Sequence, residues 1–318
     1  MVFPGQGSQK PGMLAAVAAN SNVIDATFAE ASEALGYDLG QMIAEGPAEI
    51  LNQTEYTQPA LLASSVALWR LWAEREGTPA MMAGHSLGEY SALVCAGVIP
   101  FVDGLTLVRN RGRYMQEAAP AGTGAMAAVL GLTDEDVVRV CSDLASHFDE
   151  VLEAVNFNAP GQVVVAGSKM AVERSVAAFS EAGARKVMLL PVSVPSHCAL
   201  MKPAAERLSK DLAAVTFSTP AIPVVQNVAP QVVDDVERIR ENLVCQLYRP
   251  VRWVETIRLM AASGVTRLYE CGPGSVLAGL GKRIDRSQTY ISLEEALTRS
   301  GGEQIVVKKR PVQDANRA

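Results

Sequence analysis

The stretch AGHSLGEYSALVCAG, residues 83–97, places a serine between two glycines in the pattern G-x-S-x-G. A strand-like apolar run, PAMMAG, precedes the serine, and apolar residues follow it at the spacing of one buried helical face. Gly84 and Gly88 remove side chains where a sharp strand-to-helix turn would crowd the backbone. The stretch therefore predicts a nucleophile elbow with Ser86 at its tip. The alternative role for this serine is that of a plain helix N-cap.

The composition is that of an ordinary globular protein: 318 residues, of which 49% are hydrophobic, are enough to bury a substantial core. A net charge of -6 disfavours nonspecific binding to nucleic acid. No apolar run reaches the ~18 residues of a membrane span, and the N-terminus lacks the features of a signal peptide. The five cysteines include no C-x-x-C pair, which argues against a metal site or a disulfide framework. We expect a cytoplasmic protein that binds neither membrane nor nucleic acid.

In the middle of the chain, the spacing of apolar residues alternates between strand and helix patterns. Strand, helix, strand, strand, helix and strand patterns follow one another between about residues 122 and 192, which is the order of a ferredoxin-like module. Further strands downstream, IPVVQNV and RLYECG, flank the helical pattern PVRWVETIRLMAASG. The module is therefore expected as an insertion in a larger α/β unit. Trp69 and Trp72 lie among apolar residues at helical spacing and are expected in the core.

A serine nucleophile needs a base, and the chain offers three histidines. His85 adjoins the serine, where neighbouring side chains diverge, and His147 ends a charged surface helix. His197 follows the strand that returns the chain from the inserted module, and strand ends of an open α/β sheet meet at one rim. His197 is therefore the candidate base. The N-H of Leu87, with a second N-H from Gln6 in the turn PGQGSQ, would form the oxyanion hole.

Nine short motifs occur in one order along the chain: FPGQGSQ, TQPA, GHSLGEYSALVCAG, RGRYMQ, GTGAMAAVLG, NFNAPGQVVVAG, VPSHCALM, QLYRPVRW and ECGPGSVLAGLGKRI. From residue 2 to about 295 the chain resembles the malonyl-CoA:acyl carrier protein transacylase family. The resemblance implies an α/β-hydrolase-like large domain, here residues 1–121 and 193–295, with an inserted ferredoxin-like small subdomain at 122–192. Residues 296–318 are expected as a C-terminal tail with at most one short strand.

The resemblance also assigns roles to residues. Ser86 would carry the acyl group, and His197 would act as general base and then acid, oriented by the backbone carbonyl of Gln246. That arrangement would explain why no triad aspartate is evident. Arg111 matches the arginine that pairs with the malonyl carboxylate, and Gln6 matches the active-site glutamine.

Other positions match with less definite roles. Gln58 and Asn158 match residues that line the same cleft. Ser196, directly before the histidine, follows the malonyl rather than the methylmalonyl pattern. Arg109 and Arg113 are expected as solvated helix arginines.

The implied function is ping-pong transfer of malonyl from malonyl-CoA to acyl carrier protein, without metal or cofactor, which supplies extender units for fatty-acid synthesis. The expected partners are malonyl-CoA, coenzyme A and acyl carrier protein, and a monomer is expected. Lys186, Lys202, Arg249 and Arg252 are candidates for receiving an acidic carrier protein. Three alternatives stay open: a discrete acyltransferase of polyketide synthesis, an acyl hydrolase on the same scaffold, and an inactive scaffold that binds carrier proteins.

Overall fold

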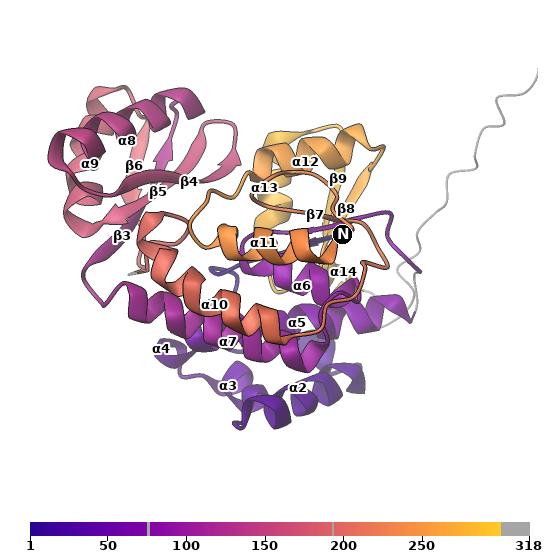
Figure 1. Cartoon of the computed structure of the whole chain (residues 1–318). Helices are drawn as coiled ribbons and strands as arrows, with labels where there is room; N and C mark the ends of the chain where they lie inside the picture. Colours follow the sequence, from indigo (N-terminus) through magenta and orange to yellow (C-terminus); the bar gives the residue numbers. More distant parts are fainter. Residues whose placement is uncertain (75–76, 193, 300–318) are drawn as a thin grey trace, which may run out of the picture.

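A five-stranded parallel sheet with the strand order β7-β2-β1-β8-β9 forms one centre of the fold. Its strands are β1 (Val2–Phe3), β2 (Met82–Gly84), β7 (Val224–Val225), β8 (Arg267–Glu270) and β9 (Thr289–Ser292). The neighbouring strands β7, β2 and β1 are short, apolar and buried, as expected for a parallel sheet that is covered on both faces. The computed structural model describes residues 1–74, 77–192 and 194–299 (Figure 1).

A separate four-stranded antiparallel sheet has the order β4-β5-β3-β6. Its strands are β3 (Gly124–Leu130), β4 (Leu152–Ala159), β5 (Gln162–Ser168) and β6 (Lys186–Leu189). The helices α8 (Asp134–Phe148) and α9 (Lys169–Glu181) pack against one face of this sheet (Figure 1). The predicted α/β class, with a parallel sheet and a ferredoxin-like antiparallel sheet, is confirmed. The exact domain boundaries stay a prediction.

The remaining helices lie on the parallel sheet or pack against the helices that cover it. They are α1 (Ala15–Ala18), α2 (Asn22–Leu35), α3 (Leu39–Glu45), α4 (Ala48–Leu51), α5 (Thr54–Ala73), α6 (Leu87–Cys95), α7 (Phe101–Ala118), α10 (Lys202–Ala214), α11 (Val236–Gln246), α12 (Trp253–Ala262), α13 (Val276–Ile284) and α14 (Leu293–Arg299), with a 3-10 turn at Ala199–Met201. Within the described ranges, no helix has the length and apolar character that a membrane span requires.

Helix α5 runs through the main hydrophobic core and is buried along most of its length. Trp72 is 6% exposed in this core and Trp69 packs against it, as predicted. The first residues of the predicted C-terminal tail belong to α14, and the predicted short strand lies outside the described residues.

The antiparallel sheet lies next to the carboxyl edge of the parallel sheet. Its second face packs against Cys198, which directly follows His197 in the chain. Strand β4 is also joined to the segment before α12, because Phe157 N donates to Val251 O at 3.0 Å and Val251 N donates to Val155 O at 2.9 Å. These contacts place the inserted sheet beside the histidine singled out in the sequence.

Candidate active site

Ser86 stands at the tip of a tight turn between β2 and α6. Its backbone has φ 53° and ψ -112°, a conformation that non-glycine residues rarely adopt. A Cβ on Gly84 would lie 1.9 Å from the backbone of Gly88, and a Cβ on Gly88 would lie 2.0 Å from the carbonyl oxygen of Phe3. The turn therefore requires both glycines of the motif, and it presents the serine side chain at the carboxyl end of β2.

Asn227 holds this strained turn from the neighbouring strand. It follows β7, which pairs with β2, and its Oδ1 accepts a hydrogen bond from Ser86 N at 2.7 Å while its Nδ2 donates to Gly84 O at 2.6 Å. Asn227 is not among the residues predicted from the sequence. The available signal was a pair of polar residues, Gln226 and Asn227, directly after an apolar strand, where functional side chains of α/β folds gather.

His197 lies against the serine, with Nε2 2.8 Å from Ser86 Oγ. Its Nδ1 is 2.6 Å from the carbonyl oxygen of Gln246, the last residue of α11. Because a carbonyl can only accept, Nδ1 carries the proton, and the lone pair of Nε2 faces the serine hydroxyl. Burial, and to a smaller extent the positive charge of Arg111, lowers the pKa of His197 to about 3. The imidazole is therefore neutral and able to accept a proton at ordinary pH.

Arg111 projects from α7 into the same site and is fully buried. Its guanidinium donates to Gln58 Oε1 at 2.8 Å, to Gln246 Oε1 at 3.0 Å and to Ser86 Oγ at 3.3 Å. In the described part of the chain, all of these partners are neutral. A buried guanidinium without an ion pair, next to a serine hydroxyl, is suited to bind a carboxylate.

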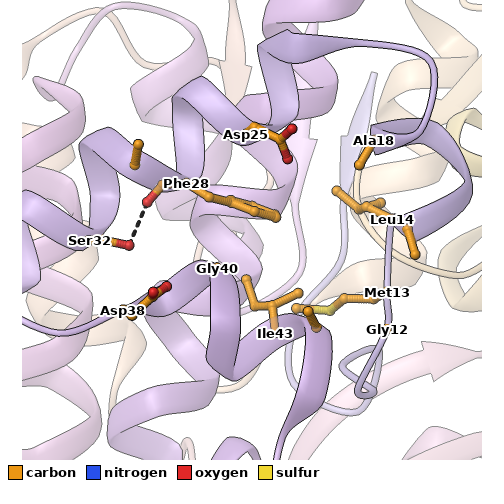
Figure 2. A pocket seen from close by; sticks show the side chains of 13 residues that line it. Gly12, Met13, Leu14, Ala18, Asp25, Phe28, Ser32, Asp38, Gly40 and Ile43 are labelled. Atoms are coloured by element: carbon orange, nitrogen blue, oxygen red, sulfur yellow. Dashed lines mark hydrogen bonds between the residues drawn. The ribbon is translucent and has the colours of Figure 1, made fainter.

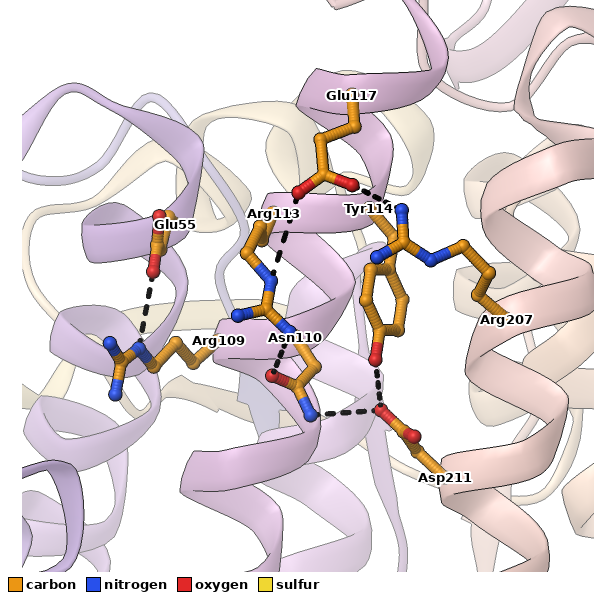
Figure 3. A network of polar contacts seen from close by, with 8 residues as sticks. All are labelled: Glu55, Arg109, Asn110, Arg113, Tyr114, Glu117, Arg207 and Asp211. Atoms are coloured by element: carbon orange, nitrogen blue, oxygen red, sulfur yellow. Dashed lines mark hydrogen bonds and ion pairs between the residues drawn. The ribbon is translucent and has the colours of Figure 1, made fainter.

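A polar network on the outer side of α7 fixes this helix against α10, which follows His197 in the chain (Figure 3). The carboxylate of Asp211 accepts from Tyr114 Oη at 2.9 Å and from Asn110 Nδ2 at 2.8 Å. Arg207 of α10 pairs with Glu117 of α7. The network thus holds the helix that carries the buried arginine in register with the segment that carries the histidine.

The two flanking arginines of α7 contact other groups. Arg109 pairs with Glu55 at 3.2 Å, and Arg113 lies 3.9 Å from Glu117. Both side chains are more than a third exposed, at 36% and 44%. They differ in this respect from Arg111, which lies between them in the sequence and is fully buried.

The two predicted oxyanion-hole residues lie beside the elbow. Leu87 is the first residue of α6, so its N-H is among those that the helix itself leaves unpaired. A Cβ on Gly5 would lie 2.6 Å from the carbonyl oxygen of His85, which places the turn that carries Gln6 against the elbow. The side chain of Gln6 is directed to Thr54 Oγ1 at 3.3 Å. The oxyanion-hole role of the two N-H groups stays a prediction.

Asn158 contacts His85, the residue before Ser86. Its Oδ1 lies 2.7 Å from His85 Nε2, and the His85 ring packs edge-on against Trp253 with centroids 5.4 Å apart. Asn158 belongs to β4, so this hydrogen bond connects the antiparallel sheet to the elbow.

Glu89, in the first turn of α6, is a second site residue that was not predicted from the sequence. It is 1% exposed, and its Oε2 accepts from Gln246 Nε2 at 2.6 Å and from Asn227 N at 3.2 Å. Burial raises the pKa of this carboxyl from 4.5 to about 7. The available signal was an acidic residue within the buried pattern GHSLGEYSAL, where a charge needs partners to be tolerated.

Among residues 1–74, 77–192 and 194–299, no group of three His, Cys, Asp or Glu side chains is arranged to hold a metal ion. A cavity of about 580 Å³ opens between α1, α2 and α3, lined mainly by apolar groups with Asp25 and Asp38 at its edge (Figure 2). None of the residues predicted for the active site lines this cavity.

Comparison with known proteins gives consistent matches along the chain. The acyl transferase domain family matches residues 1–300. A malonyl CoA-acyl carrier protein transacylase of Salmonella typhimurium is 58% identical over 295 residues, covering 92% of this chain and 95% of the relative. The protein of the same name from Bacillus subtilis is 42% identical, covering 93% of each chain.

Solved structures with the same fold are similar in sequence as well. An acyl carrier protein S-malonyltransferase from Vibrio cholerae is 56% identical with a TM-score of 0.89, covering 92% of this chain and 95% of the other. A second structure, titled as a type II PKS acyl-carrier protein in complex with its malonyl-transacylase, is 52% identical with a TM-score of 0.91, covering 95% and 97%.

Proposed function

Because the chain belongs to the acyl transferase family, and its relatives are malonyl CoA-acyl carrier protein transacylases, we propose that it transfers malonyl from malonyl-CoA to the phosphopantetheine thiol of an acyl carrier protein. The protein is an acyltransferase. The observation that carries the specific proposal is the contact of Ser86 Oγ with both His197, at 2.8 Å, and Arg111, at 3.3 Å. A nucleophile, its base and a carboxylate-binding cation thus meet at one oxygen atom.

In the first half-reaction, His197 Nε2 accepts the proton of Ser86 as Oγ attacks the thioester carbonyl carbon. The N-H groups of Leu87 and Gln6 would stabilise the oxyanion of the tetrahedral intermediate. When the C-S bond breaks, the histidine returns its proton to the sulfur of coenzyme A. The product is malonyl-Ser86 together with free coenzyme A.

In the second half-reaction, the thiol of the carrier protein gives its proton to His197, and its sulfur attacks the serine ester. Collapse of the second tetrahedral intermediate breaks the bond to Ser86 Oγ, which takes the proton back. The net change is exchange of one thioester for another, so no oxidant or reductant is needed.

Arg111 supplies the selectivity in this proposal. The planar guanidinium can donate two parallel hydrogen bonds to the free carboxylate of the malonyl group, and it would hold the ester carbonyl in one pose. An acetyl group has no carboxylate for this site. If an acetyl group entered the site, the buried guanidinium of Arg111 would stay without an ionic partner.

Carrier proteins are acidic, so an acidic enzyme needs a local basic surface to receive one. The side chains of three of the candidates are exposed and remain part of the proposed docking surface: Lys186, Lys202 and Arg249. Arg252 pairs with Glu255 at 2.6 Å, which weakens its contribution. Charge reversal at the three exposed residues should slow transfer to carrier protein and leave malonylation of the enzyme unchanged. An unchanged rate of transfer would contradict this docking surface.

Isotope exchange tests the proposed function. Labelled coenzyme A incubated with malonyl-CoA and enzyme should enter the malonyl-CoA pool without any carrier protein, because the first half-reaction is reversible. Release of malonate without exchange would instead favour an acyl hydrolase. If neither exchange nor malonate release occurs, the result favours an inactive scaffold. Comparing carrier proteins of fatty-acid and polyketide synthesis as acceptors then tests the proposed role in fatty-acid synthesis.

A further inference from the structure

One buried side chain, that of Gln246, connects Arg111 to a carboxylate that the proposed mechanism does not use, that of Glu89. The Gln246 amide accepts from the guanidinium through Oε1 at 3.0 Å. The same amide donates through Nε2 to Glu89 Oε2 at 2.6 Å and to the backbone oxygen of Ser86 at 3.0 Å. Gln246 therefore lies between the only two formally charged groups of this chain of contacts.

The orientation of the Gln246 amide is set by its surroundings. The backbone carbonyl of Ser86 is an acceptor only, and so is the side chain of Glu89 when it is ionised. The NH₂ group of Gln246 must therefore face both of them. The amide oxygen is then left to face Arg111. Glu89 is in turn held by Asn227 N at 3.2 Å.

The charges in the site also connect Glu89 with Arg111. Within the described residues, Arg111 forms no ion pair, although it is fully buried. An unpaired buried charge is costly, and Glu89 is the carboxylate whose charge acts on Arg111. The second oxygen of this carboxyl, Oε1, is buried without a hydrogen-bond partner in the described structure. A structural role in hydrogen bonding alone would be served as well by an amide.

We propose that Glu89 is a positioning residue for the malonyl carboxylate: acting through the Gln246 amide, it orients the Arg111 guanidinium and offsets part of its charge without occupying its substrate-binding side. This inference rests on the proposed function. A direct ion pair would block the arginine, whereas a carboxylate one amide away stabilises it and leaves it open. Glu89 thereby sets how strongly the site attracts a diacid thioester.

The test measures binding in a Ser86→Ala background, where acylation cannot occur. At pH 8 the Kd of malonyl-CoA is compared by calorimetry between Ser86→Ala and Ser86→Ala/Glu89→Gln, with acetyl-CoA as the ligand that lacks a carboxylate. The substituted amide can keep both accepted hydrogen bonds while removing the charge. We expect the Kd of malonyl-CoA to fall about three- to tenfold, with less than about a twofold change for acetyl-CoA.

Glu270 provides a matched control. It is also 1% exposed, but its carboxylate accepts from Leu277 N and Ala278 N in the first turn of α13. Glu270→Gln in the same background should leave both affinities unchanged. Unchanged or weaker malonyl-CoA binding in a folded Glu89→Gln protein would overturn the role of Glu89. A Ser86→Ala parent that does not prefer malonyl-CoA to acetyl-CoA would overturn the proposed diacid site itself.

A second measurement applies if the Glu89→Gln protein does not fold. The affinity ratio of malonyl-CoA to acetyl-CoA is followed from pH 6 to 8 in the Ser86→Ala protein. The other titratable or charged groups around Glu89 stay constant there, because Arg111 remains charged, burial raises the pKa of Tyr90 and the pKa of His197 is about 3. Ionisation of Glu89 should weaken the preference for malonyl-CoA as pH rises. A ratio that does not change would contradict the proposal.

Discussion

His197 Nδ1 donates a hydrogen bond to the backbone carbonyl of Gln246 over 2.6 Å, in the position where many serine enzymes use a carboxylate. A carbonyl orients the imidazole and fixes its tautomer, but it carries no full negative charge to stabilise an imidazolium. The arginine beside it acts against protonation. The structure therefore holds this imidazole in its neutral form.

The first prediction concerns pH and activity. Burial and the charge of Arg111 lower the pKa of His197 from 6.5 to about 3. Activity is lost when a base is protonated, so it should fall only as pH drops through this lowered value, and kcat/KM for malonyl-CoA should show no acid limb near 6.5. Initial rates between pH 5 and 8 measure this, with circular dichroism to confirm the fold. A limb with a midpoint close to 6.5 would show that water reaches the imidazole of His197 and that its pKa is not lowered.

The second prediction concerns selectivity. Arg111→Ala should lower kcat/KM for malonyl-CoA by about 100-fold, the equivalent of about 3 kcal/mol, because a charge-assisted bidentate contact is lost. The rate with acetyl-CoA should change only a few-fold. Arg113→Ala, on the same helix but exposed, is the matched control and should affect neither substrate. If Arg111→Ala keeps the preference for malonyl, another group binds the carboxylate.

The third prediction concerns stability and pH, where Glu89 and His197 act in opposite directions. His197 binds a proton in the unfolded chain below 6.5 but not in the folded protein above about 3, so it makes stability rise with pH in that window. Glu89 binds a proton in the folded protein up to about 7 but in the unfolded chain only below 4.5, so it makes stability fall with pH. The two effects should largely cancel between pH 4.5 and 6.5.

Glu89→Gln removes one of these two effects. The difference in unfolding free energy, variant minus wild type, should therefore increase with pH between 4.5 and 7, by up to about 1.4 kcal/mol per pH unit. Urea titrations at several pH values measure it. A difference that stays constant across this range would mean that the Glu89 carboxyl titrates normally.

The fourth prediction concerns the elbow. Gly88→Ala would place a methyl group 2.0 Å from the backbone oxygen of Phe3, which cannot move without disturbing β1, so a loss of more than about 2 kcal/mol is expected. Gly279 is exposed in α13, and a Cβ added to it would have no atom within 4 Å. Gly279→Ala should be neutral or stabilise by up to about 1 kcal/mol. Thermal unfolding of the two variants checks the contrast; equal stabilities would argue against the close approach at the elbow.

Much of the fold and the centre of the site could be predicted from sequence, because the signals are local. Periodicity and the G-x-S-x-G spacing identify the order of strands and helices and the serine turn. His197 emerged because few histidines exist and strand ends share one rim. Its carbonyl partner came from the family resemblance, since a backbone group leaves no residue-specific signal in a single sequence.

The residues that were missed act across long sequence distances. Asn227, which follows β7, reaches the elbow across 141 positions, and Glu89 meets Gln246 across 157 positions. Neither pairing follows from spacing or propensity, because each depends on how β7 and α11 pack beside α6. Asn158 was assigned to the cleft by resemblance, and its contact with His85 became visible only with the antiparallel sheet in place.

Intact-mass spectrometry after brief mixing with malonyl-CoA tests whether Ser86 is the nucleophile and accepts malonyl. We expect a mass increase of one malonyl group on the wild-type protein, none on Ser86→Ala, little with acetyl-CoA, and loss of the adduct when phosphopantetheinylated carrier protein is added. A malonyl adduct on Ser86→Ala, or no adduct on the folded wild-type protein, would contradict it.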